Sequence, residues 1–268
     1  MSTPRTPSAT RLRRRLSFLS PVWWGPAAVT LVVLGFAWQA AAHRWPYLLA
    51  PLDRIAESLR SQPGYFLTQA WTTLREALLG LGIGFVVAFA LAILISELPV
   101  ARRAIMPIAV VLNVTPLVAI APALVVAFGF GPAPKLILTS LICFFPILIN
   151  TAAGLRTVPL PVLQVYRSVD ASRGEILRHL RIPSALPYVF AALQIVFPLS
   201  IIGAVVAELN AAGSSAGLGT TIQVATSMNH LSTVWAAIFV LALMGSLLLL
   251  LVTVVERRVL HWHESRQR

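Results

Sequence analysis

Apolar residues in this chain gather into six long stretches that are almost free of charged side chains. A helix that crosses the hydrocarbon core of a membrane needs about 20 predominantly apolar residues, and each stretch meets that length. We therefore predict an all-α membrane protein, a polytopic bundle of about six transmembrane helices. The predicted spans are residues 21–42, 77–95, 104–134, 136–155, 182–207 and 233–255.

Two segments between the spans carry polar patterns of their own. Residues 52–60 place Leu52, Ile55 and Leu59 at helical spacing with charged side chains opposite, which predicts a short amphipathic helix at the outer interface. Residues 210–232 are rich in Gly, Ser, Thr and Asn. Because lipid does not tolerate irregular backbone, we predict an outer loop or a short re-entrant piece packed against protein.

The basic residues are spread unevenly over the two sides that these spans define. Cytoplasmic loops carry an excess of Lys and Arg, and with an inner N-terminus sixteen of the 21 basic residues fall on the inner side. We therefore predict cytoplasmic tails at 1–20 and 256–268 around a transmembrane domain at 21–255. The inner arginines are Arg5, Arg11, Arg13, Arg14, Arg15, Arg102, Arg103, Arg156, Arg167, Arg173, Arg178, Arg181, Arg257, Arg258, Arg266 and Arg268.

The first stretch also has features of a signal peptide, because the basic residues 11–15 precede an apolar run that ends in three alanines at 40–42. The run is longer than a usual signal core, and its removal would leave five spans with reversed parity. We therefore predict that it stays as the first span.

Composition and charge narrow the class of partner. Hydrophobic residues make up 57% of the chain and charged residues 11%, whereas a soluble domain carries about a quarter charged residues. The net charge of +12 would suit nucleic acid, but the basic residues lie in gaps between apolar runs, which predicts lipid contact and no nucleic-acid partner. The single cysteine, Cys143, excludes a disulfide framework, and His261 and His263 would diverge on a helix, so no metal site is expected.

The most informative inner segment is 156–183. It contains two predicted helical pieces, one near 161–168 and one after Asp170, which we expect to cap the second piece. Glu175 in the first turns suits the helix dipole, and Pro183 begins the next span. A pair of short helices is more than a connector needs, so we predict that this segment docks to a partner.

This segment resembles the cytoplasmic loop of binding-protein-dependent ABC importer permeases, whose pattern is E-A-A, three residues, G, nine residues, I-x-L-P. Gln164 stands at the first position of that pattern, Asp170 at the glycine and Pro183 at the closing proline, which is the one strict match. In the family this loop docks into the ATPase subunit. The resemblance implies coupling roles for Gln164, Arg167, Ser168, Asp170, Arg173, Gly174, Glu175, Leu180 and Pro183.

The resemblance extends over roughly residues 52–262 and is to the nitrate/sulfonate/taurine branch of these permeases. It implies a type I importer fold in a bacterial inner (plasma) membrane, with two permease copies, most simply a homodimer, two ATPases and an extracytoplasmic binding protein. The carrying residues are Thr73-Leu74-Arg75 with Gly80, Pro116 through Pro122 to Phe128-Gly129, Phe144-Phe145-Pro146 with Asn150, Arg167-Ser168 with Ala171-Ser172-Arg173, Pro183 with Ala185-Leu186-Pro187-Tyr188, and Ala207-Glu208 with Ser214-Ser215 and Gly217-Leu218-Gly219.

The chain lacks the elements of ATP chemistry. A P-loop ends in Gly-Lys, whereas the only lysine here, Lys135, follows Pro134. We therefore expect no catalytic residue, cofactor or metal in this chain, and ATP with Mg²⁺ on a partner subunit. The implied solute is small and organic or anionic. The regions 116–122 and 141–145 look more like permeases for pyrimidine vitamin precursors or riboflavin than those for taurine or nitrate.

Polar residues inside or at the ends of the spans are candidates for the translocation path. Interhelical hydrogen bonds explain such residues equally, and prolines in the third span would either expose carbonyls to a path or kink the helix. Glu208 has two further alternatives: its carboxylate could face outer water, or it could pair with Arg75. The candidates are Asn113, Thr115, Asn150, Glu208 and Asn210.

At the start of the second span, Arg75 and Glu76 are predicted to snorkel to the interface. Gly80 and Gly84 are predicted to allow close helix packing.

Two other classes of function stay open at this point. A secondary transporter or channel would need no ATPase, but it should carry ionisable residues deep in its spans, and this chain has almost none there. A membrane anchor or assembly subunit would not require a long structured inner segment.

Overall fold

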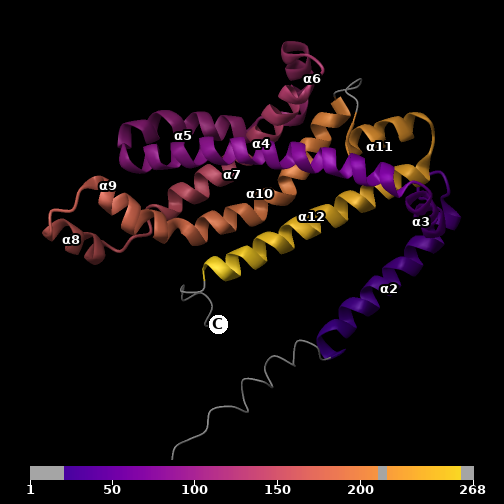
Figure 1. The fold of residues 1–268 in the computed structure, drawn as a ribbon, viewed down its shortest axis with the longest axis horizontal. Coiled ribbons are helices and arrows are strands. Elements are labelled where there is room, and N and C mark those ends of the chain that lie inside the picture. Colours follow the sequence, from indigo (N-terminus) through magenta and orange to yellow (C-terminus); the bar gives the residue numbers. More distant parts are fainter. Residues whose placement is uncertain (1–20, 211–215, 261–268) are drawn as a thin grey trace, which may run out of the picture.

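The computed structural model describes residues 21–210 and 216–260, and every regular element in these ranges is a helix (Figure 1). The predicted all-α class is confirmed. The helices are α2 (Pro21–Arg44), α3 (Leu52–Ser61), α4 (Pro63–Glu97), α5 (Pro99–Val114), α6 (Leu117–Phe128), α7 (Pro132–Gly154), α8 (Leu160–Ser168), α9 (Arg173–Ile176), the π-helical turn η2 (Leu177–Arg181), α10 (Ile182–Asn210), α11 (Leu218–Ser227) and α12 (Leu231–Val259).

Within the described residues, five helices are long and apolar enough to cross a membrane, and a sixth crossing is available if the bent pair α5 and α6 is one span. The predicted third span is this pair, bent by 97°. The bend falls at Thr115 and Pro116, and Pro116 is one of the prolines that we expected to open or kink this span. Thr115 is extended (φ −71°, ψ 132°), because a residue before proline avoids the α conformation.

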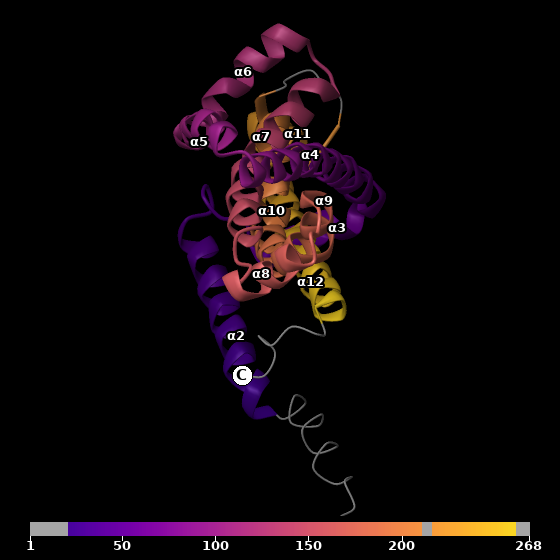
Figure 2. The ribbon, with the colours of Figure 1, turned by 90° about the vertical axis from the view of Figure 1, so that its left-hand side faces the viewer.

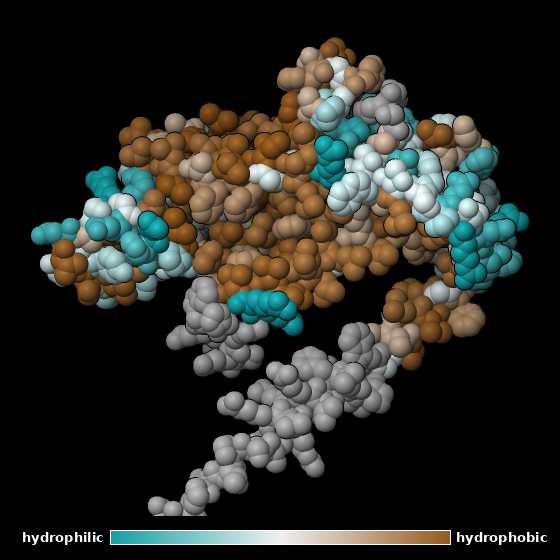
Figure 3. All heavy atoms as spheres, in the orientation of Figure 1, coloured by the Kyte–Doolittle hydropathy of each residue, from teal (hydrophilic) through white to brown (hydrophobic). Residues whose placement is uncertain are grey.

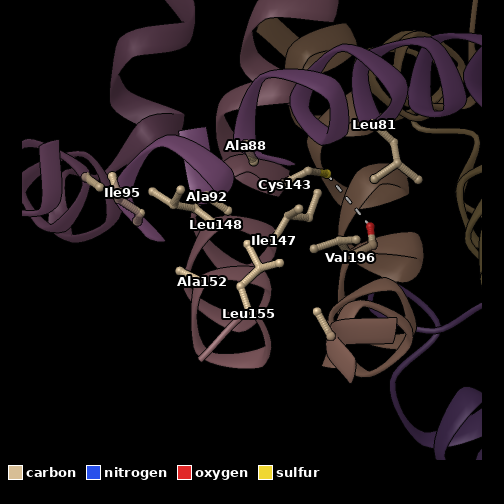
Figure 4. Packing of buried hydrophobic residues seen from close by; sticks show 12 residues of the cluster. Leu81, Ala88, Ala92, Ile95, Cys143, Ile147, Leu148, Ala152, Leu155 and Val196 are labelled. Carbon is tan, nitrogen blue, oxygen red and sulfur yellow. Dashed lines mark hydrogen bonds between the residues drawn. The ribbon is translucent and has the colours of Figure 1, made fainter. Parts of the chain in front are cut away.

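Three helices, α4, α7 and α10, form the centre of the bundle (Figure 2). Gly80 and Gly84 lie against α7, where an added Cβ would come within 2.6 Å of Thr139 Cβ and 2.7 Å of the Ser140 carbonyl oxygen. The predicted role of these glycines in close packing is confirmed within one chain. Figure 4 shows the apolar core between the three helices, which includes Leu81, Ala88, Ala92, Ile95, Cys143, Ile147, Leu148, Ala152, Leu155 and Val196.

The other described helices extend this core unevenly. A second apolar cluster joins α3, α11 and α12 to α4 and α10. Ile55, on the apolar face of the predicted amphipathic helix α3, is buried in this cluster. By contrast, α2 runs away from the bundle (Figure 1) and is joined to it near one end, where Trp38 contacts Trp235 with ring centroids 4.6 Å apart. The predicted first span is therefore a helix whose apolar sides are mostly uncovered by this chain.

Hydrophilic residues gather at two ends of the bundle, with an apolar band between them (Figure 3). One end carries α8, α9 and the turn between α4 and α5, and the opposite end carries α3 and α11 (Figure 1). Such a band flanked by polar ends is the surface that a bilayer requires. The multi-pass architecture follows, with residues 156–183 at one end and residues 216–232 at the other.

Candidate functional site

The α8–α9 hairpin (residues 160–181) turns at a residue with left-handed backbone. Asp170 has φ 54°; its N–H donates to the Arg167 carbonyl (3.1 Å), and the Ala171 N–H donates to the Tyr166 carbonyl (3.1 Å). These two bonds form a Schellman motif that ends α8. Glycine suits this conformation best, and Asp is among the few other residues that adopt it. The departure from glycine at position 170 therefore preserves the turn.

The expectation that Asp170 caps α9 is wrong, because Asp170 terminates the preceding helix. The cap is Ser172, whose Oγ accepts from the Glu175 N–H (3.3 Å) while Glu175 Oε2 accepts from the Ser172 N–H (2.8 Å). This reciprocal pair is a capping box, whose pattern S-x-x-E is present in the sequence itself. Glu175 does lie in the first turn, as predicted.

The hairpin continues into a membrane span without a break. Residues 173–210 form one helix through α9, η2 and α10, with a π-type turn at η2 where the Ile182 N–H donates to the Leu177 carbonyl. Pro183 follows directly, and its ring cannot accommodate a normal α-helical carbonyl four residues earlier. The wider turn absorbs this conflict. Pro183 thus lies in the first turn of α10, as expected, but in a helix that starts earlier.

An ion pair ties the hairpin to the central helix α4. Arg181 Nη1 lies 2.5 Å from Glu97 Oε1 and 3.5 Å from Ser96 Oγ. Arg156, which precedes the hairpin, donates to the Ile95 carbonyl at 2.8 Å. A groove of about 570 Å³ separates the hairpin from the α4–α5 turn. It is lined by Ser96, Glu97, Leu98, Pro99, Leu163, Arg167, Ala171, Arg173, Ile176 and Arg181.

The outer surface of the hairpin is open and partly apolar. Leu160, Val165 and Val169 keep 71%, 63% and 72% of their surface exposed although they lie at a hydrophilic end of the bundle. Exposed apolar side chains rimmed by polar ones are typical of protein-docking surfaces. Of the residues predicted for coupling, Leu180 is half-buried. The exposed ones are Gln164, Arg167, Ser168, Asp170, Arg173, Gly174, Glu175 and Pro183.

At the opposite end, Glu208 lies inside the protein. It is fully buried; Oε1 accepts from Thr73 Oγ1 (2.7 Å) and Oε2 accepts from the Gly219 N–H (2.6 Å), while the Leu218 N–H donates to Thr73 Oγ1 (2.8 Å). The carboxylate therefore holds the start of α11. The readings in which it faces outer water or pairs with Arg75 are wrong, because its oxygens are already used inside the bundle.

A second buried contact stands beside the first. Lys135 Nζ lies 2.8 Å from Glu76 Oε1 and donates to the Ala216 carbonyl at 3.4 Å, and both charged side chains are largely buried. Glu76 thus pairs inward and does not snorkel, whereas Arg75 is exposed and its snorkelling stays a prediction. Together with Gln69, which accepts from the Gly217 N–H at 2.6 Å, these residues form the buried polar cluster: Gln69, Thr73, Glu76, Lys135 and Glu208.

Sequence reasoning missed most of this cluster. In the sequence, Lys135 served only to show that the chain lacks a P-loop, and Thr73 served only as one of the residues that carry the family resemblance. The available signal was that Glu76 and Lys135 are opposite charges at the starts of two apolar runs. Gly217 confirms how tightly the cluster holds α11. It has φ 133°, and an added Cβ would collide with the Glu208 carboxylate.

The structure does not gather the predicted path residues into one site. Asn113 is exposed on α5, and Thr115 bonds to the Val111 carbonyl of its own helix. Asn150 donates to the Pro146 carbonyl and Asn210 to the Val206 carbonyl, again within their own helices. Their role in a path stays a prediction. Among the described residues there is no cluster of three or more potential His, Cys, Asp or Glu metal ligands, and His261 and His263 lie outside these residues.

Comparison with known proteins shows relatives along nearly the whole chain. The family described as binding-protein-dependent transport system inner membrane component matches residues 80–261. The riboflavin transport system permease protein RibX of Chloroflexus aurantiacus is 30% identical over 271 residues, covering 97% of this chain and 99% of the relative. The formylaminopyrimidine transport permease protein ThiX of Halalkalibacterium halodurans is 29% identical, with 88% and 94% covered.

The taurine transport system permease protein TauC of Escherichia coli is 28% identical, covering 94% of this chain and 89% of the relative. Other relatives are named for aliphatic sulfonates and nitrate, which confirms the predicted branch. The family match covers more than half of the chain, and its members are transport permeases rather than enzymes. This multi-pass helical chain therefore belongs to the family of binding-protein-dependent transport system inner membrane components.

Proposed function

We propose that this chain is the permease subunit of an ATP-driven importer and that its α8–α9 hairpin docks a separate ATPase. The observation that carries the proposal is the exposed apolar surface of Leu160, Val165 and Val169 at a polar end of the bundle. An ATPase that covers this surface would bury the three side chains. ATP and Mg²⁺ would then belong to the partner, since the chain has no P-loop lysine.

The proposed mechanism uses two rigid links between the hairpin and the spans. A displacement of α9 by the ATPase passes into α10, because residues 173–210 are one helix. The same displacement reaches α4 through the pair of Arg181 and Glu97. Since α4, α7 and α10 share one packed core, they move together, and the bundle rocks to alternate access to a path.

The proposed orientation places the α8–α9 end and both termini in the cytoplasm. It rests on the excess of arginines at that side. The opposite end, with α3 and α11, would then face the extracytoplasmic binding protein. We further propose two copies of this permease with two ATPases, and an inner-membrane location in a bacterium.

For the solute, we propose a small organic molecule of the pyrimidine vitamin-precursor or riboflavin type ahead of an anion such as taurine or nitrate. The relatives named for riboflavin and formylaminopyrimidine are 30% and 29% identical to this chain, and the relative named for taurine is 28% identical. The deep parts of the spans are also nearly free of ionisable residues that would pair with an anion.

The test is uptake into proteoliposomes that hold this chain, its candidate ATPase and a solute-loaded binding protein. We expect ATP-dependent uptake, and loss of ATPase co-purification when Val165→Asp and Val169→Asp are combined. Gln62→Asp, an exposed change at the opposite end, is the matched control for docking and should retain ATPase co-purification. Uptake by the chain alone would instead indicate a secondary transporter, and stable ATPase binding without uptake would indicate an anchor.

A further inference from the structure

Next to the α8–α9 hairpin lies a second pocket, of about 640 Å³, that no step of the proposed mechanism uses. It opens where the end of α4, the start of α5 and Arg156, two residues beyond α7, meet. Its lining contains three arginines and no carboxylate. The lining residues are Ser96, Pro99, Arg102, Arg103, Met106, Pro107 and Arg156.

The acid next to the lining of this arginine pocket in the chain forms its ion pair with an arginine outside the pocket. Glu97 follows Ser96 of the lining, and its ion pair is with Arg181 on the hairpin side. The pKa of Arg156 is lowered by partial burial and by the positive charges of Arg102 and Arg181. The guanidinium of Arg156 is held close to these positive charges because it donates a hydrogen bond to the Ile95 carbonyl. Three like charges held together in this way favour an anion with several acceptor oxygens.

The surface that leads away from the pocket is apolar. Arg103, Pro107, Val111 and Val114 are spaced by four, four and three residues, which places them on one face of α5, and all four are exposed. From Arg103 to Val114 the helix rises about 16 Å at 1.5 Å per residue, roughly the depth of one leaflet of a hydrocarbon core about 30 Å thick.

We propose that the arginine pocket binds the phosphate of an anionic phospholipid whose acyl chains lie along the exposed face of α5. The order of groups fits this ligand, with guanidinium groups at the polar end of the bundle and an uninterrupted apolar strip towards its middle. In Figure 1, α5 lies at the edge of the bundle, where it packs against α4 and α7 and leaves its far side open. Basic pockets between helices at the membrane surface bind acidic headgroups in this way.

A free anion would use the arginines but not the strip. Inorganic phosphate, or an anionic solute leaving a path, has no acyl chains to cover Val111 and Val114. The proposal goes beyond the coupling role of the hairpin and does not depend on it. It can be tested on the full chain without an ATPase, so that its failure would leave the proposed function untouched.

The experiment is native mass spectrometry of the purified full chain, titrated with dioleoylphosphatidylglycerol. The variant R102Q/R103Q/R156Q removes the three charges, and R60Q/R178Q/R257Q removes three exposed charges elsewhere as a matched control. We expect the apparent affinity for phosphatidylglycerol to fall roughly 10- to 100-fold in the first variant and to stay within about twofold in the control. Phosphatidylcholine should bind all three proteins alike.

Two further arms keep the result decisive. If the triple variant does not fold, Arg103→Gln alone, at an exposed position, should still weaken phosphatidylglycerol binding several-fold. Excess inorganic phosphate should not displace the lipid. An unchanged affinity for phosphatidylglycerol in both arginine variants would overturn the proposal. Displacement of phosphatidylglycerol by inorganic phosphate would also overturn it and would identify a site for small anions instead.

Discussion

The two polar ends of this permease differ in whether their polar side chains are buried or exposed. At the α11 end, Glu208, Thr73 and Lys135 are buried and Glu76 is largely buried, and each makes at least one hydrogen bond inside the chain. At the α8–α9 end, eight of the nine predicted coupling residues are exposed, next to uncovered apolar side chains.

The polar cluster at the α11 end thus stabilises the fold by contacts within the chain, as a brace, whereas the α8–α9 hairpin leaves a surface open for a partner. A buried polar group without its bond costs free energy, so the cluster rigidly fixes α11 on α4 and α10. The hairpin is stiff in itself, through its Schellman motif and capping box, but offers its outer face for docking. Changes at the α11 end should therefore affect folding first, and changes at the hairpin should affect coupling first.

The largest effect is expected from Lys135→Met, which leaves the Glu76 carboxylate buried without its cation. Breaking a buried pair in this way costs about 3–5 kcal/mol. The change should sharply lower the thermal unfolding midpoint of the purified protein in detergent. The double change Lys135→Met with Glu76→Leu removes both charges and should recover most of the loss. Equal instability of the single and double variants would show that the pair is not what stabilises this end.

Glu208→Ala should rank next, because it strands the Gly219 N–H and the Thr73 hydroxyl. Two buried donors without acceptors cost together about 3 kcal/mol. Glu208→Gln keeps one acceptor oxygen and should cost less. Protection of the α11 amides in hydrogen exchange measures the result directly. If Glu208→Ala abolished uptake while leaving stability and exchange unchanged, Glu208 would act in the path and not as a brace.

At the hairpin, Arg181→Glu should lower stability by only about 1 kcal/mol, because the pair with Glu97 is partly exposed. We expect a larger effect on the number of solute molecules imported per ATP hydrolysed, since the link between the hairpin and α4 is lost. The charge swap Arg181→Glu with Glu97→Arg should restore that ratio in proteoliposomes. A ratio unaffected by Arg181→Glu would rule out the ion pair as a transmitting contact.

The smallest effect is expected at the turn. Asp170→Gly should raise the unfolding free energy by up to about 1 kcal/mol, because glycine adopts a positive φ without the steric cost that Asp bears. Asp170→Val should lower it, since a β-branched residue disfavours this conformation. Circular dichroism during thermal unfolding compares the two with the parent chain. Identical midpoints for all three would mean that the turn does not limit stability.

Much of the fold was predictable because membrane spans depend on local composition. The six apolar stretches became α2, α4, the bent α5–α6 pair, α7, α10 and α12, and residues 52–60 became α3. The capping box of Ser172 and Glu175 is also a local pattern, although we expected Asp170 to be the cap. Position 170 shows why: Asp suits both a helix start and a left-handed helix end, and only the bonds of Tyr166 and Arg167 distinguish the two.

The partners of charged residues were not predictable in this way. Lys135 and Glu76 are 59 residues apart, and Thr73 and Glu208 are 135 apart, so their contacts exist only once α4, α7 and α10 have packed. The sequence by itself determined the membrane class, the spans and the segment that carries the family's loop pattern, because hydrophobic length and short-range capping are local properties. The tertiary structure decided which polar groups are buried braces and which remain open for a partner, because burial and pairing depend on neighbours distant in the chain.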